Sequence, residues 1–156
     1  MSTGYIWDKS FLGHDTSKYH PENPLRLKNL DFLEMSSDLP GLINIPNRDT
    51  LGRSAALRIH SNDYLLRFEN DVLMGREWFD YFDTKLKQDT YEVALKSVSA
   101  AVSLTAEVCK GNIENGFAAL RPPGHHARPS KAKGFCYFNN VAICARYAQM
   151  IHGLKN

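Results

Sequence analysis

Small and apolar residues recur at helical intervals between Asp89 and Lys110, the longest regular pattern in the chain. Residues that repeat every three or four positions fall on one side of a helix, so the pattern predicts a helix with one buried stripe. Gly111 follows directly, and glycine is common just after a helix end. We therefore expect the longest helix to start at Asp89 or Thr90 and to end near Lys110. The stripe consists of Val93, Ala94, Val98, Ala101, Val102, Thr105, Val108 and Cys109.

Four shorter segments combine helix-start signals with apolar periodicity. Asn23 can cap a helix whose first residue is Pro24, and Ser61 can cap another. Gly153 closes the last helix of the chain. We expect these helices from Pro24 to about Met35, from Asp49 or Thr50 to about Ile59, from Ser61 to about Leu73, and from about Asn140 to about Ile151.

Short apolar runs lie between the helical segments at Gly4–Trp7, Leu42–Ile45 and Phe117–Leu120, and these runs predict strands. The segment Gly75–Gln88 contains aromatic residues without alternation, and we expect a mixed loop there. Strands that alternate with helices indicate an α/β fold, a three-layer α/β/α sandwich with a mostly parallel sheet. A parallel sheet needs both faces and its neighbouring strands covered, so three strands predict a fold that is incomplete in this chain.

The composition is that of one soluble globular domain, with 156 residues, 43% of them hydrophobic and 23% charged. A net charge of +2 gives no reason to expect direct contact with nucleic acid or a membrane. Cys109, Cys136 and Cys144 form no CxxC pair, which favours reduced thiols in the cytoplasm, with the nucleus as a second location in a eukaryote. We see neither an apolar signal-peptide core nor an apolar run near the ~20 residues of a membrane span.

The stretch from Arg121 to Asn140 carries the candidate chemistry. Two prolines and Gly124 end the preceding strand and turn the backbone, and the adjacent His125 and His126 follow at once. Two imidazoles side by side can divide proton transfer, one taking a proton from water and one giving a proton to a leaving group. The alternative is an exposed histidine pair on a basic loop. The rigid lead-in and the later Gly-Phe-Cys segment favour the catalytic interpretation.

The segments RPPGHHA and GFCYFNNVAICAR resemble the zinc-dependent histone deacetylase superfamily, which includes acetylpolyamine amidohydrolases and bacterial deacetylase-like amidohydrolases. The RPPGHHA form is closest to the class II and bacterial branches. The resemblance covers residues 1–156 as the N-terminal part of a single histone deacetylase-like catalytic domain. It implies an arginase/deacetylase-like fold with a larger sheet than three strands.

The resemblance also implies roles for four residues of this stretch. His126 would be the general base and acid, and His125 would give electrostatic support, although the sequence alone does not separate these two roles. Gly134 would offer its carbonyl to the amide N–H of the substrate. Phe135 would form one wall of a narrow tube for an acyl-lysine stem, with ordinary core packing as the alternative.

Two upstream residues complete the implied site, and a third matches the family pattern without a place in the site. Arg26 would lie near the floor of the pocket beside an internal channel, or else be a surface arginine. Asp83 would accept hydrogen bonds from the substrate backbone at the pocket mouth, or else be a capping or solvated carboxylate. For His60, within a family-like His-Ser-x-x-Tyr segment, we expect structural packing at a helix end.

Zn²⁺ is the cofactor that the resemblance implies, and its ligand motifs would follow Asn140. No such motif occurs there, so we expect no metal ligands in this chain. The upstream group Asp8, His14, Asp15 and His20 lacks helix-face spacing and is a weak alternative.

The predicted function is therefore that of an amidohydrolase acting on an acylated lysine peptide, an acetylated polyamine or another small amine. We expect the isolated chain to be inactive unless a companion chain supplies the other half. The alternative is a catalytically dead, truncated module that binds a partner, or one half of a split enzyme.

Overall fold

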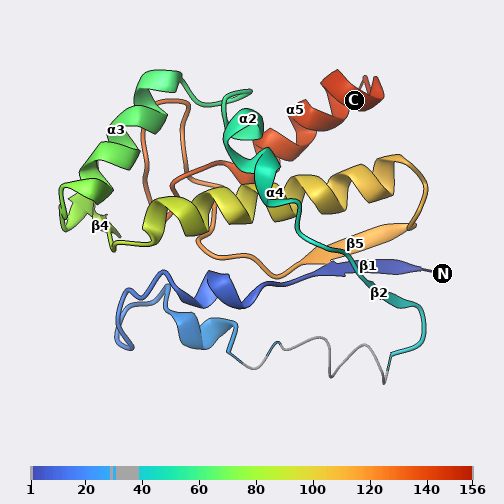
Figure 1. The fold of residues 1–156 in the computed structure, drawn as a ribbon, viewed down its shortest axis with the longest axis horizontal. Coiled ribbons are helices and arrows are strands. Elements are labelled where there is room, and N and C mark those ends of the chain that lie inside the picture. The colour runs from blue at the N-terminus through green and yellow to red at the C-terminus, as the bar shows by residue number, and fades with distance from the viewer. Residues whose placement is uncertain (1, 29, 31–38, 156) are drawn as a thin grey trace.

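A computed structural model describes residues 2–28, 30 and 39–155 of the chain. Its main sheet has three parallel strands in the order β2-β1-β5, formed by Leu42–Asn44, Thr3–Ile6 and Asn115–Ala118 (Figure 1). The three predicted strands are therefore confirmed, with shifted bounds. The last strand starts two residues early because Asn115 and Gly116 pair with Thr3 and Gly4.

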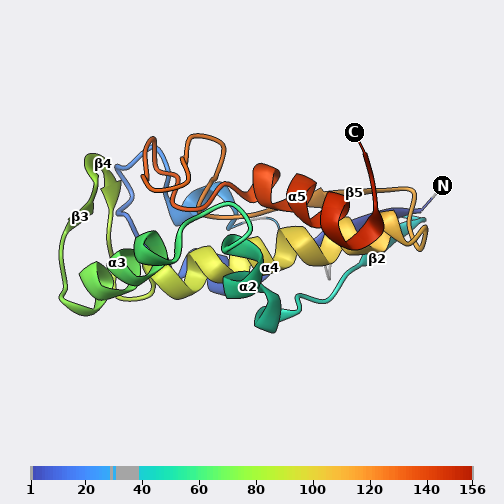
Figure 2. The ribbon, with the colours of Figure 1, turned by 90° about the horizontal axis from the view of Figure 1, so that it is seen from above.

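Helix α4 (Thr90–Cys109) runs along the long axis of the molecule and lies against the sheet (Figure 1, Figure 2). Glycines let neighbouring segments approach it closely. A Cβ atom on Gly116 would lie 2.8 Å from Leu104 Cδ1, and one on Gly4 would lie 2.9 Å from the same atom. A Cβ atom on Gly52 would lie 3.0 Å from the Leu95 carbonyl carbon. The close packing of these segments against α4 therefore depends on glycine, which has no side chain, at these three positions.

The prediction of a single buried stripe on α4 was too narrow. Val93, Ala100 and Leu104 pack with the sheet, whereas Ala94 and Val98 belong to a second core under the other helices. Helix α4 is thus a central layer with apolar partners on two sides. The second core is covered by α2 (Gly52–Ala56), α3 (Asn62–Leu73) and α5 (Asn140–His152), which lie on the side of α4 away from the sheet (Figure 1).

The predicted cap of α3 is present, because the Ser61 side chain accepts a hydrogen bond from the Tyr64 N–H. Helix α5 is capped by Asn139, whose side chain accepts from the Ala142 N–H. Gly153 ends α5 with a φ of 68°. Two 3₁₀ turns, η1 (Lys9–Leu12) and η3 (Asp49–Leu51), lie earlier in the chain. The turn η3 leads directly into α2.

The helix predicted from Pro24 begins as expected, with the Asn23 side chain accepting from the Leu25 N–H. It forms the 3₁₀ turn η2 (Pro24–Arg26), and Leu27 closes that turn. Most of the predicted continuation to Met35 lies outside the described residues.

The prediction of a mixed loop at Gly75–Gln88 was wrong. This segment contains an antiparallel hairpin of β3 (Trp78–Phe79) and β4 (Tyr81–Lys85). Asp80 makes the turn with a φ of 62°. The hairpin is held by tertiary contacts rather than by an alternating pattern, since Phe79 is fully buried in the core.

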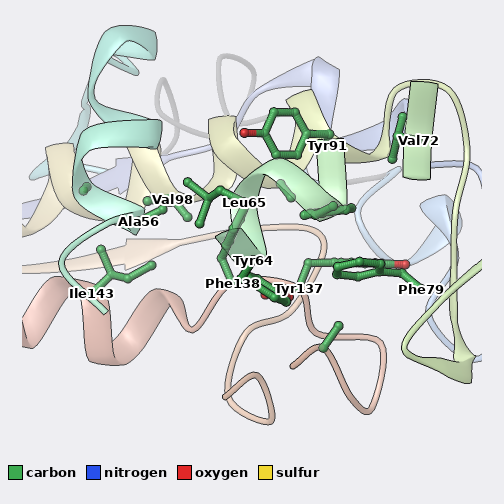
Figure 3. Close-up of a cluster of buried hydrophobic side chains, with 14 of the residues drawn as sticks. Ala56, Tyr64, Leu65, Val72, Phe79, Tyr91, Val98, Tyr137, Phe138 and Ile143 are labelled. Atoms are coloured by element: carbon green, nitrogen blue, oxygen red, sulfur yellow. The ribbon is translucent and has the colours of Figure 1, made fainter. Parts of the chain in front are cut away.

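An aromatic core joins this hairpin to α3, α4 and the end of the histidine-bearing loop (Figure 3). Phe68 stacks on Tyr137 at 5.0 Å and on Phe79 at 4.8 Å between ring centroids. The Tyr64 hydroxyl donates to the Tyr137 carbonyl at 2.6 Å. The end of the loop that carries the candidate chemistry is therefore packed in this aromatic core. In the part of the chain that the structure describes, no helix has the length and apolarity needed to cross a bilayer.

Candidate active site

A cavity of about 310 Å³ brings together five of the six predicted site residues, although they come from distant parts of the sequence. A larger cavity of about 510 Å³ beside the end of α3 contains none of them, so we assign the chemistry to the smaller one. The smaller cavity is lined by Pro21, Glu22, Arg26, Pro123, His125, His126, Gly134 and Phe135.

The histidine pair lies beyond the carboxyl end of β5, where α/β sheets commonly place their functional groups. The rings of His125 and His126 are 4.2 Å apart between centroids and tilted by 53°. Both side chains are exposed in this chain. Gly124 lets the backbone before the histidines pass close to the start of α5, because a Cβ atom there would lie 2.6 Å from the Asn140 backbone nitrogen. The pair is therefore available to a ligand in the cavity.

Gly134 and Phe135 also line the cavity, and both have positive φ, 58° and 65°. A Cβ atom on Gly134 would lie 2.6 Å from His126 Cδ2, so this position lacks room for a side chain. Phe135 is half-buried and meets the His20 ring edge-on at 4.8 Å. An aromatic residue in left-handed backbone geometry is strained, and such strain concentrates at functional sites. The carbonyl of Gly134 accepts the Cys136 thiol at 3.2 Å.

Arg121 and Glu22 form a buried ion pair that the sequence did not reveal. Arg121 Nε donates to Glu22 Oε1 at 2.5 Å and Nη2 donates to Oε2 at 2.9 Å. The other guanidinium donors bind the carbonyls of Phe11 and His14 at 2.8 and 2.6 Å. An arginine directly after an apolar strand, flanked by proline, was the available signal. The ion pair joins the loop that carries the histidines to the segment from Phe11 to Glu22, which we call the first loop.

Glu22 also explains where Arg26 lies. Arg26 Nη1 donates to Glu22 Oε1 at 3.3 Å, and the Arg26 side chain is 51% exposed. The structure thus places Arg26 on the cavity lining, half in solvent and steered by a buried carboxylate. Its predicted role beside an internal channel stays a prediction.

His14 is part of the same buried region. Its Nδ1 atom lies 2.9 Å from Thr90 Oγ1, and its Nε2 atom lies 3.9 Å from Glu22 Oε2. Burial and, to a smaller extent, the Arg121 charge lower the pKa of His14 to about 3. Asp8 instead caps η1 by accepting from the Ser10 N–H. Within residues 2–28, 30 and 39–155, no three His, Cys, Asp or Glu side chains are grouped to hold a metal ion.

Asp83 is the predicted site residue that does not line the cavity. Its Oδ2 atom accepts a hydrogen bond from the Gly134 N–H at 3.1 Å. Its Oδ1 atom is buried and has no hydrogen-bond partner among the described residues. Asp83 therefore contacts the cavity lining through Gly134. Its role toward the substrate stays a prediction.

His60 is packed as expected from the sequence. Its Nε2 atom accepts from the Asn139 N–H at 3.0 Å, and its ring stacks on Tyr64 at 5.3 Å. Burial lowers the pKa of His60, so the neutral ring serves as a structural acceptor at the start of α5.

Comparison with known proteins decides the family. The model of the histone deacetylase domain matches residues 20–156. This chain belongs to the histone deacetylase family. A probable deacetylase of Archaeoglobus fulgidus is 32% identical over an alignment of 152 positions that covers 94% of this chain and 41% of that protein. A histone deacetylase-like amidohydrolase of Pseudomonas aeruginosa is 31% identical, over 97% of this chain and 38% of that protein.

A further relative and a solved structure agree with this membership. Human polyamine deacetylase HDAC10 is 37% identical over 62% of this chain and 15% of its own length. The crystal structure of an HDA15 HD domain superposes with a TM-score of 0.81 at 28% identity, covering 95% of this chain and 43% of that chain. The predicted fold class, the arginase/deacetylase-like α/β fold, is confirmed. The histone deacetylase-like chain spans about two fifths of the two microbial relatives.

Proposed function

We propose that residues 1–156 form the N-terminal part of a single catalytic domain that removes acetyl or another short acyl group from a lysine or amine nitrogen. The observation that carries the proposal is the exposed pair His125 and His126 on a cavity walled by Gly134 and Phe135. The names of the relatives, which include a probable deacetylase and a polyamine deacetylase, support an acylated amine as substrate.

The two imidazoles would carry the proton transfers of this hydrolysis. His126 accepts a proton from water as the water oxygen attacks the acyl carbon, and it returns that proton to the nitrogen when the C–N bond breaks. His125 stabilises the developing charge from beside it. Gly134 supports this assignment because its close approach to the His126 ring fixes the position of one imidazole and not the other.

The cavity wall suggests how the substrate is held. The half-buried face of Phe135 and the ring of Pro123 offer apolar contact to a methylene chain, while the polar end of the substrate meets the histidines. An acylated lysine peptide, an acetylated polyamine and a small acylated amine all share this chemistry.

Zinc is the cofactor that we propose for the complete domain. The described residues do not fit a metal ion by themselves, because they contain no group of three suitable ligands. The ligands would therefore come from polypeptide beyond these residues, in one continuous protein or in a companion chain. Bound zinc would polarise the acyl carbonyl and lower the pKa of a bound water.

A chimaera tests the proposal. Residues 1–156 replace the matching segment of the Pseudomonas aeruginosa relative, and turnover of an acetyl-lysine peptide is measured together with zinc content. We expect an active, zinc-loaded chimaera, while the 156-residue chain alone shows no turnover with added zinc. A folded, zinc-loaded chimaera without activity would refute the proposal.

The same chimaera separates the roles of the histidines. His126→Ala should lower kcat by about 10²–10⁴-fold, the usual contribution of acid-base catalysis. His125→Ala should lower kcat less, with zinc content unchanged in both variants. Loss of zinc from either variant would show that the histidines bind the metal, against the roles given above.

A second candidate function is that of a partner-binding module or half of a split enzyme. Strand β5 is the last strand in the order β2-β1-β5, and Phe117 on it is 54% exposed. A strand edge with an exposed aromatic residue offers a surface for another polypeptide. An in-frame Asp-x-His segment in the DNA after the last codon would favour the enzyme over the binding module.

A further inference from the structure

The β3–β4 hairpin is joined to the cavity wall through two carboxylates. Asp80 Oδ2 accepts the Ala132 N–H at 2.7 Å, and Asp83 Oδ2 accepts the Gly134 N–H at 3.1 Å. The two amides are two residues apart along the loop. Because both hydrogen bonds have an ionisable acceptor, they are stronger than bonds between neutral groups. The hairpin thus holds the loop directly before Phe135.

Asp80 is itself held by an arginine from α3. Arg67 Nη1 lies 2.6 Å from Asp80 Oδ1, and Arg67 Nη2 lies 3.4 Å from Oδ2. The same guanidinium donates to the Ser130 carbonyl at 3.2 Å and covers the Phe79 ring at 4.5 Å. A planar guanidinium with these contacts fixes the carboxylate in one orientation. Arg67 therefore orients the Asp80 carboxylate toward the Ala132 amide, and it also binds the loop directly through the Ser130 carbonyl.

The loop transmits this attachment to the candidate site. Gly134 has no Cβ atom and is in close contact with the His126 ring, and Phe135 follows with strained positive φ. A conformation of this kind persists only where its surroundings enforce it. Movement of residues 130–134 away from the hairpin would shift both the imidazole and the aromatic wall.

We propose that Asp80, oriented by Arg67, is a positioning residue of the candidate active site. It attaches residues 130–134 to the hairpin so that Gly134 fixes His126 and Phe135 walls the cavity. The geometric part of this inference stands without the proposed function, whereas its consequence for catalysis rests on that function.

The test uses the complete 156-residue chain and its own cysteines. Cys136 is fully buried, and its thiol donates to the Gly134 carbonyl, so it reports detachment of the loop. Cys144 lies on α5, away from the hairpin, and reports general unfolding. Alkylation by iodoacetamide is followed at each cysteine by mass spectrometry, at protein concentrations too low for association.

Two variants remove the contact in different ways. Asp80→Asn tolerates the positive φ and keeps a neutral acceptor, while Asp80→Gly relieves the φ and removes the side chain altogether. We expect the labelling rate of Cys136 to rise about tenfold in Asp80→Gly, the equivalent of one charged hydrogen bond, and less in Asp80→Asn. The rate at Cys144 should stay unchanged in both.

Asp71→Asn is the matched control. Asp71 lies on α3, and its Oδ1 atom pairs with Arg76 Nε at 2.8 Å. This variant should leave the labelling of Cys136 at the level of the unsubstituted chain. The ring proton signals of His126 in NMR spectra should shift in Asp80→Gly and not in Asp71→Asn, a difference that general stability would not produce.

The outcomes separate this inference from the proposed function. Unchanged Cys136 labelling and unchanged His126 signals in Asp80→Gly would overturn it. Equal acceleration at all three cysteines in both Asp80 variants would also overturn it, because Asp80 would then support the whole fold. An inactive chimaera with a protected Cys136 would refute the proposed function and leave the geometric inference intact.

Discussion

The two sides of the candidate cavity are attached to the fold by different kinds of ion pair. On the side of the first loop, Arg121 and Glu22 are 0% and 2% exposed, and the guanidinium also binds two backbone carbonyls. On the side of the hairpin, Arg67 is 42% exposed and Asp80 11% exposed. We call the first pair the buried clamp and the second the surface clamp.

Because of this difference in burial, we expect the buried clamp to affect the free energy of unfolding and the surface clamp to affect the position of one loop. Breaking a buried pair leaves an uncompensated charge inside the protein, whereas an exposed pair contributes little to the free energy of unfolding. The surface clamp can therefore set the position of a loop without supporting the whole fold. Loss of the buried clamp should instead destabilise the whole structure on which the cavity depends.

The largest effect is expected from Arg121→Met. This variant removes the buried partner of the Glu22 carboxylate and leaves it the half-exposed Arg26, so it should lower the free energy of unfolding by about 3–5 kcal/mol. Urea unfolding followed by circular dichroism measures the change. The double variant Arg121→Met/Glu22→Gln should recover part of the loss, since no charge is then left behind. A single variant that costs less than about 1 kcal/mol would contradict the burial of this clamp.

A smaller effect is expected from acid on the buried side. The pKa of His14 is lowered to about 3 by burial, below the 6.5 of an unfolded histidine. The unfolded state therefore binds a proton that the folded state does not, and stability falls as the pH drops below 6.5, levelling off near 3. Between pH 6.5 and 5 the loss should be on the order of 2 kcal/mol.

His14→Asn is the variant that checks the origin of this loss. It lacks a titrating ring, so the slope of stability against pH between 6.5 and 5 should become shallower, whatever the variant costs at neutral pH. Urea midpoints at several pH values give both slopes. The same slope in the variant and the unsubstituted chain would assign the acid sensitivity to other groups.

The smallest effect on stability is expected at the surface clamp. Arg67→Gln should change the free energy of unfolding by no more than about 1 kcal/mol, as is usual for partly exposed pairs. Added salt should accelerate labelling of Cys136 in the unsubstituted chain, because ions screen Arg67 and Asp80. That salt effect should disappear in Arg67→Gln. A salt effect that persists in this variant would show that another charge holds the loop.

Local signals in the sequence predicted those parts of the fold that depend on local chemistry. The cap at Ser61, the end at Gly153 and the span of α4 each follow from neighbouring residues. Part of the buried surface of α4 outside the predicted stripe was missed because it contains serines. Ser97 and Ser99 are buried by donating their hydroxyls to distant carbonyls, and a polarity pattern cannot show such partners.

The contacts that attach the site were beyond reach for the same reason. Arg121 and Glu22 are 99 residues apart, and Asp80 meets Ala132 across 52 residues. The β3–β4 hairpin likewise depends on the burial of Phe79 in a distant core rather than on alternation. Motif residues could be named from the sequence because their chemistry is local, whereas the residues that hold them in place depend on the folded chain.

The glycines around α4 have a consequence for how variation in this family is interpreted. Gly4, Gly52 and Gly116 come from three segments, and each meets α4 within the reach of a single methyl group. In a complete set of single substitutions, these positions should tolerate as little change as the histidine pair, although none of them lines the candidate cavity. Intolerance to substitution therefore identifies two unrelated groups in this chain, and only contact with the cavity tells them apart.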